Sequence, residues 1–121
     1  MRKLLTLSII LLLVSACYWE NEEALYPGPD NCDTLDVSYS ADVVPIMTNN
    51  CYACHSNANA PDFSFGITLE DYEDISASAS SVVGAINHAT GYPAMPKGAE
   101  KLDTCSIAII EAWVNMGAPD N

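Results

Sequence analysis

Apolar residues recur three or four positions apart in two parts of the chain, which is the spacing that puts side chains on one face of a helix. Val43 and Met47 form the first such pair. A longer series lies near the end of the chain: Cys105, Ile109, Trp113 and Met116. We therefore predict a leading helix and a final helix, and we expect both Met47 and Met116 to lie in the core.

Polar residues mark where these two helices begin and end. Ser40 can cap the leading helix, which is expected to run into the segment at 51–55. Asp103 or Thr104 can cap the final helix. Gly117 is typical of the position just beyond a helix end, so the final helix is expected to stop immediately before it.

Two shorter helices are predicted between the leading and final helices. Thr68 and Asp71 have the spacing of a capping box, which indicates a helix that continues through Ile75. Ser81 can cap a further helix over 82–88.

The remaining segments carry loop signals. Segment 57–65 surrounds Pro61, and segment 91–98 contains both glycine and proline. A short extended piece is expected around 37–39, but no convincing strand pattern and no internal repeat is present. The sequence therefore predicts a small all-α domain, which we expect to occupy 32–121.

The first 31 residues have a different character. Residues 1–16 combine a basic start with a short apolar run and small residues, which is typical of a secretory signal peptide and too short for a comfortable membrane span. Cys17 follows directly, as in a bacterial lipobox, a resemblance that implies cleavage before Cys17 and its lipidation. Residues 17–31 are acidic and lack an apolar period, so they are predicted to be a flexible tether. This organisation predicts an exported protein, lipid-anchored to a bacterial membrane at its periplasmic face or at the cell surface.

The charge balance adds a constraint on partners. The whole chain has a formal net charge of −12. Removal of Arg2 and Lys3 with the leader would leave Lys97 and Lys101 against 16 acidic residues, a formal net charge of −14. Such a surface should repel nucleic acid and favour partners with a basic docking patch.

The segment Cys51-Tyr-Ala-Cys54-His55 carries the most specific chemistry in the chain. Two cysteines three apart with a histidine directly after the second form the attachment signature of a c-type haem. Residues three and four apart share a helix face, so Cys51 and Cys54 can form thioethers to the two vinyl groups while His55 binds the iron as the proximal ligand. The motif occurs once, which predicts one covalent haem.

The two cysteines at the ends of the predicted domain form another candidate pair. Cys32 and Cys105 are the ones left after lipidation and haem attachment are assigned. An exported protein is in an oxidising compartment, which favours a disulfide between them, although two separate buried thiols are the alternative.

The region from Cys32 to Asn121 resembles a class I cytochrome c. The resemblance rests on the haem motif, the Met95-Pro96 loop and the final helix with its aromatic Trp113. It implies a helical fold packed around haem, His/Met ligation and one-electron transfer between redox partner proteins, with no enzymatic activity. Met95, held between two prolines, is the favoured distal ligand, and His88 is the alternative.

Other uses of the same residues stay open at this point. A haem sensor or haem enzyme with a displaceable sixth ligand would need a distal acid–base group, for which His88 is the one histidine available. Without haem, Cys51 and Cys54 could form a redox dithiol, or bind zinc with His55 and a further cysteine. By analogy, the carbonyl of Pro61 is expected to accept the His55 ring N–H.

Overall fold

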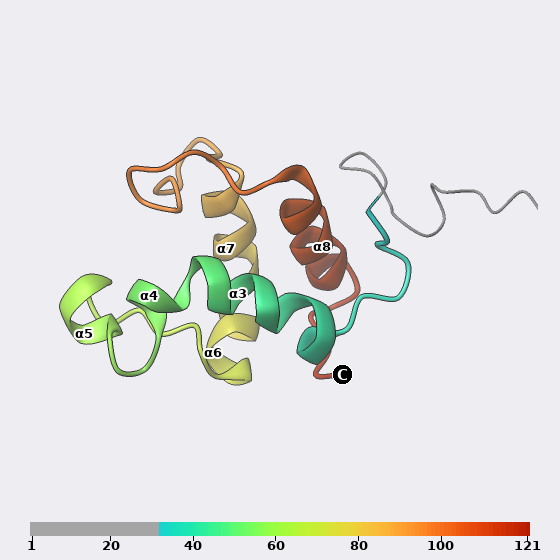
Figure 1. Ribbon diagram of the computed structural model, residues 1–121, viewed down its shortest axis with the longest axis horizontal. Helices are drawn as coiled ribbons and strands as arrows, with labels where there is room; N and C mark the ends of the chain where they lie inside the picture. The colour runs from blue at the N-terminus through green and yellow to red at the C-terminus, as the bar shows by residue number, and fades with distance from the viewer. Residues whose placement is uncertain (1–31) are drawn as a thin grey trace, which may run out of the picture.

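The computed structural model describes residues 32–121, and this part of the chain is helical with no strand (Figure 1). The elements are η1 (Tyr39–Val43), α3 (Val44–Asn50), α4 (Tyr52–His55), α5 (Ala60–Phe63), α6 (Tyr72–Ala77), α7 (Ala79–Ile86) and α8 (Thr104–Asn115). The prediction of a helical domain is thereby confirmed for these residues. The predicted signal peptide, lipidated Cys17 and tether lie outside the described residues.

The leading helix begins two residues earlier than predicted. Ser38, not Ser40, is the N-cap: its hydroxyl accepts a hydrogen bond from the N–H of Ala41, and its own N–H donates to the Asp42 carboxylate at 2.8 Å. This reciprocal pair satisfies two backbone donors at the helix start, which a cap at Ser40 would leave open. The extended piece expected at 37–39 is therefore shorter than predicted, because Ser38 is extended but Tyr39 already lies in the first turn.

The middle of the chain contains more helix than predicted. The expected loop at 57–65 includes α5, in which Pro61 occupies the first turn, where its missing N–H costs nothing. The third predicted helix starts at Ala79 instead of residue 82 and ends at Ile86, so His88 lies beyond it. Segment 91–98 contains no helix, as predicted.

The final helix has the predicted ends but not entirely the predicted face. Asp103 caps it, accepting from the backbone N–H of Ser106 at 2.9 Å, and Gly117 follows its last turn with a φ of 93°. Trp113 is fully buried, but Met116 is 44% exposed, so its assignment to the core is wrong. Ile110, which lies outside the predicted series, is fully buried instead.

The core lies where the two ends of the domain meet. Its largest fully buried side chains are Trp113, Met47, Ile75, Ile110 and Val43. The ring of Tyr39 stacks on Trp113 at 5.5 Å and meets Tyr72 edge-on at 5.2 Å. η1 contacts α8, and α7 packs against both α8 and α6 (Figure 1). The leading and final helices are thus joined through aromatic contacts, which are stabilising beyond their buried area.

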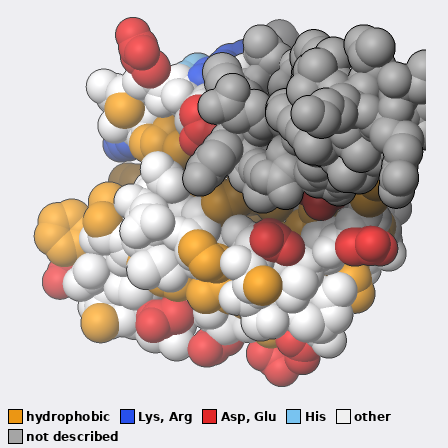
Figure 2. All heavy atoms as spheres, turned by 45° about the vertical axis from the view of Figure 1, so that its right-hand side comes forward, with side chains coloured by type: hydrophobic (Ala, Val, Ile, Leu, Met, Phe, Trp, Pro, Cys, Tyr) orange, Lys and Arg blue, Asp and Glu red, His pale blue; other side chains and the backbone are white. Residues whose placement is uncertain are grey.

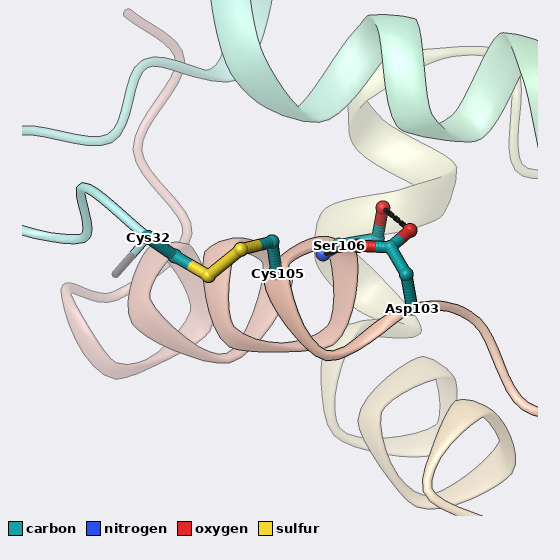
Figure 3. Close-up of a disulfide and its surroundings, with 4 residues drawn as sticks. All are labelled: Cys32, Asp103, Cys105 and Ser106. Atoms are coloured by element: carbon teal, nitrogen blue, oxygen red, sulfur yellow. Dashed lines mark hydrogen bonds between the residues drawn. A yellow bond between two sulfur atoms is a disulfide. The ribbon is translucent and has the colours of Figure 1, made fainter. Parts of the chain in front are cut away.

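Two further links hold the ends of the domain together. A disulfide joins Cys32 to Cys105 in the first turn of α8, with Cα atoms 5.3 Å apart (Figure 3). This is the pairing that the cysteine count favoured. The side chain of Asn121 accepts from the backbone N–H of Tyr39 at 2.7 Å and donates to the carbonyl of Val37. Within 32–121, no helix is long and apolar enough to cross a membrane.

Candidate functional site

The cysteine–histidine motif forms a separate helical turn directly after α3. Cys51 ends α3, where its N–H donates to the carbonyl of Met47 at 2.8 Å. The carbonyl of Cys51 then accepts from the N–H groups of Cys54 and His55 at 3.1 and 2.9 Å. Residues at this spacing are neighbours on a helical turn, although Cys51 itself precedes α4. Cys51 is half-buried, Cys54 is exposed, and neither is in a disulfide.

The imidazole of His55 is fixed by one hydrogen bond. Its Nδ1 lies 2.9 Å from the carbonyl oxygen of Ile67, twelve residues further along the chain. A carbonyl can only accept, so Nδ1 carries the hydrogen of the neutral ring. Nε2 is then left with a free lone pair, the form in which histidine binds a metal. The acceptor is not Pro61, as the analogy suggested, because Pro61 lies in α5 and the chain returns to His55 only at Ile67.

The Ile67 carbonyl also accepts a hydrogen bond from a buried side chain. The hydroxyl of Ser64 lies 2.8 Å from this oxygen and 3.1 Å from the carbonyl of Ala60, the two acceptors that its single hydrogen can reach. Leu69 closes the segment by donating its N–H to the carbonyl of His55 at 2.9 Å. Ser64 and Ile67 are therefore site residues that the sequence interpretation missed, and no spacing rule would have identified them.

Met95 is held by the end of α7. Its N–H donates to the carbonyl of Ala85 at 3.0 Å, and its carbonyl lies 3.0 Å from Nε2 of His88. The side chain of Met95 is half-buried. The two candidates for the distal ligand are thus in contact with each other, with His88 bonded to the backbone of Met95.

The two halves of the candidate site extend to the same side of α7. In Figure 1 the turn that contains α4 and α5 lies at the lower left, and the loop that follows α7 lies above it. The structure therefore directs the segment that carries Cys51, Cys54 and His55 and the loop that carries Met95 toward one end of the molecule.

Large apolar side chains lie exposed next to this motif. Phe63 and Phe65 are 66% and 94% exposed, Ile67 is 54% exposed, and Tyr92 in the opposite loop is 44% exposed. Where exposed apolar side chains form a contiguous patch, that patch marks a binding site. The ring of Trp113, by contrast, is part of the core, and Tyr72 packs against it.

The protonation of Cys51 bears on the alternatives without haem. Burial raises the pKa of its thiol to about 11, so the thiol stays protonated at neutral pH. Redox-active dithiols depend on a lowered pKa, which is the opposite change. Among residues 32–121, no group of three or more His, Cys, Asp and Glu side chains is arranged to hold a metal ion, and Cys32 and Cys105 are bonded to each other. The geometry thus favours neither a reactive dithiol nor a zinc site.

The remaining residues could hold a prosthetic group covalently and bind its metal. They are two cysteines outside any disulfide and one imidazole with Nε2 available, and exposed apolar side chains follow them along the chain. Comparisons with family models, curated proteins and solved structures found no match to this chain.

Proposed function

We propose that this protein is a membrane-anchored, monohaem c-type cytochrome that carries single electrons between redox partners outside the cytoplasm. The observation that carries the proposal is the hydrogen bond from His55 Nδ1 to the Ile67 carbonyl, on the same turn as two cysteines outside any disulfide. It leaves the Nε2 lone pair of His55 available for iron, beside two thiols with the spacing of the haem attachment signature.

Cys51 and Cys54 would hold the group covalently. Each thiol would do so by adding its S–H across a vinyl C=C bond, with the sulfur on the inner carbon and the hydrogen on the terminal carbon, so that no group has to leave. Burial raises the pKa of the Cys51 thiol to about 11, which keeps the hydrogen that this addition would need. Two thioethers fix the position of the group relative to His55.

The chain's other residues would orient the ligands and exclude water. Ser64 and Ile67 hold the His55 ring, while the exposed side chains of Phe63 and Phe65 provide apolar surface against a porphyrin. When bound, a c-type haem supplies a one-electron couple, in which an electron from a donor protein reduces ferric to ferrous iron and then passes to an acceptor. Met95 is the proposed distal ligand, since a thioether favours the ferrous state.

The surface charge supports a transient carrier with basic partners. Asp and Glu side chains are spread over the face shown in Figure 2, and the whole chain carries 16 acidic against four basic residues. Complementary charge accelerates encounter and weakens with salt, which suits a protein that must bind and release partners repeatedly. The lipid at Cys17 and the segment 17–31 would keep the domain near a membrane.

The first experiment asks whether haem is covalent. After expression in cells with haem-attachment machinery, a denaturing gel stained for haem should label the native chain and not the Cys51→Ala, Cys54→Ala double variant. A colourless native chain would overturn the proposal.

The second experiment tests ligation and electron transfer together. Redox titration followed by absorption should give one single-electron couple, with a thioether–iron charge-transfer band in the ferric protein. Met95→Ala should remove this band, while Met116→Ala, at an exposed methionine of the same domain, should leave it unchanged. Rapid binding of carbon monoxide to the native reduced protein would instead favour the alternative, a haem sensor or enzyme with a displaceable ligand.

A further inference from the structure

We propose that His88 is a positioning residue for Met95 and not a competing iron ligand. Its ring nitrogen Nε2 holds the backbone carbonyl of Met95, so that the thioether is presented from a fixed backbone. This inference rests on the proposed haem function, and it assigns to the second histidine of the chain a role in ligand retention.

Both backbone polar groups of Met95 are bound by the end of α7. The N–H of Met95 donates to the carbonyl of Ala85, and the carbonyl of Met95 accepts from Nε2 of His88. The donor–acceptor distance is 3.0 Å in both hydrogen bonds. The N–H and the carbonyl of Met95 belong to the two peptide planes on either side of its Cα atom, so the two contacts restrain both planes. A thioether is a weak ligand, so it binds better when its backbone is already ordered and little conformational entropy is lost on binding.

The backbone of His88 is fixed by the motif that ends α7. His88 has a φ of 51°, in the left-handed region, where glycine is the usual residue. It forms a Schellman motif: the N–H of Ala89 donates to the carbonyl of Gly84 at 2.9 Å, and that of His88 donates to Ala85 at 3.1 Å. Glycine or asparagine would adopt this conformation at a lower cost. The ring of His88 is thus carried by a residue whose backbone is fixed by the helix end.

The hydrogen bond also determines which ring nitrogen of His88 carries the hydrogen. The Met95 carbonyl can only accept, so His88 Nε2 is a donor. His88 could bind iron through Nε2 only after losing both this hydrogen and its contact with Met95. Its Nδ1 keeps a lone pair, so ligation through Nδ1 is the alternative that substitutions of His88 have to exclude.

Three substitutions of His88 separate the effect of losing the imidazole ring from the effect of the unusual backbone conformation. His88→Gly removes the ring and suits the positive φ. His88→Asn also suits it, but its amide does not reach as far as Nε2. His88→Gln has an amide nitrogen at about the distance of Nε2 and can donate to the same carbonyl. Ala118→Gly is the matched control, because Ala118 has the same φ of 51° after α8 and no ring to lose.

The experiment titrates imidazole into the ferric holoprotein, where it competes with the Met95 thioether. Loss of one hydrogen bond is expected to tighten imidazole binding about three- to tenfold in His88→Gly and His88→Asn. The same variants should have a weaker thioether–iron band and a lower reduction potential, because thioether ligation raises that potential. His88→Gln should restore all three properties to near the native values, and Ala118→Gly should not change them.

Two results would overturn the inference while the proposed function survives. The first is imidazole affinity within twofold of native in both His88→Gly and His88→Asn. The second is loss of six-coordinate iron in these variants together with an intact spectrum in Met95→Ala, which would make His88 the ligand. A protein without covalent haem would overturn the proposed function as well, so the failures are distinguishable.

Discussion

Gly84 lies directly against the ring of Tyr92, in the loop that leads to Met95. A Cβ atom at position 84 would come within 2.6 Å of the ring carbons Cγ and Cδ2, closer than real Cβ contacts allow. The glycine in the middle of α7 therefore permits the close return of this loop over the helix. This contact accounts for a glycine at position 84, although glycine in a helix is less stable than alanine by about 1 kcal/mol.

Whether Gly84→Ala lowers or raises the free energy of unfolding should depend on the ring of Tyr92. In the native background, the added methyl must displace the ring and the loop, and we expect a loss of about 1–3 kcal/mol in the free energy of unfolding. In a Tyr92→Ala background, the same substitution should stabilise the protein by up to about 1 kcal/mol through helix propensity. Urea unfolding of the four proteins measures the difference, and equal effects in both backgrounds would contradict the contact.

The buried hydroxyl of Ser64 should contribute to stability through the Ile67 carbonyl. Ser64→Ala removes the 2.8 Å contact with that oxygen but leaves the His55 contact in place. We expect the free energy of unfolding to fall by about 1 kcal/mol, the usual net contribution of a hydrogen bond. Ser76→Ala, which removes an exposed hydroxyl bonded to the Glu73 carbonyl at 3.2 Å, should change it by less than about 0.5 kcal/mol.

The disulfide should be a major contributor to stability and irrelevant to haem attachment. The bonded cysteines are 73 positions apart. Replacing Cys32 and Cys105 together by serine removes the constraint on the unfolded chain and should cost about 4 kcal/mol by the loop-entropy relation. Urea unfolding gives the stability, and haem staining should be unchanged. A double variant as stable as the native protein would show that the bridge does not restrict the unfolded chain.

Asn121 should stabilise the start of the leading helix from the other end of the domain. Asn121→Ala removes the acceptor for the N–H of Tyr39 and the donor to the Val37 carbonyl, so we expect a loss of about 1–2 kcal/mol. Asn121→Asp keeps the acceptor alone and should lie between Asn121→Ala and the native protein. Hydrogen exchange at the Tyr39 amide should accelerate in Asn121→Ala and remain slow in Asn121→Asp.

Alkaline pH should destabilise the domain partly through Tyr52. Burial, followed by the charges of Tyr39, Cys51 and Glu70, raises the pKa of Tyr52 from 10.0 to about 12. Between these values the unfolded chain loses the phenol proton while the folded protein keeps it, so the free energy of unfolding falls as pH rises from about 10 to about 12. Tyr52→Phe should flatten this dependence.

Urea unfolding at several pH values tests the prediction for Tyr52. Tyr92→Phe serves as the control because Tyr92 is 44% exposed. An unchanged alkaline slope in Tyr52→Phe would exclude Tyr52 as its source.

Local signals in the sequence predicted the features that depend on neighbouring residues. Asp103 at the start of α8 and Gly117 after its end act within one turn, so residue type alone identified them. The 51–55 motif was equally local, and its turn has the expected geometry. The disulfide pairing was predicted by assigning Cys17, Cys51 and Cys54 to other roles, which left Cys32 and Cys105 as the remaining pair.

Features that depend on contacts between residues distant in the sequence could not be predicted in this way. The acceptor for His55 is a backbone carbonyl, which every residue possesses, so nothing in the sequence distinguished Ile67 from Pro61. His88 had the side chain of an iron ligand, and only the loop geometry shows it bonded to Met95. Met116 matched the apolar spacing of α8, but the helix ends beside it and leaves its side chain exposed.

The bridge between Cys32 and Cys105 also determines how mechanical load enters the domain. Tension applied to the chain before Cys32 passes through the sulfur atoms into the first turn of α8 (Figure 3). Residues 33–104, which include the whole candidate site, lie inside the covalent loop, so they carry none of that force when the chain after Cys105 resists it. Tension between the two ends of the domain would therefore leave His55 and Met95 mechanically unloaded.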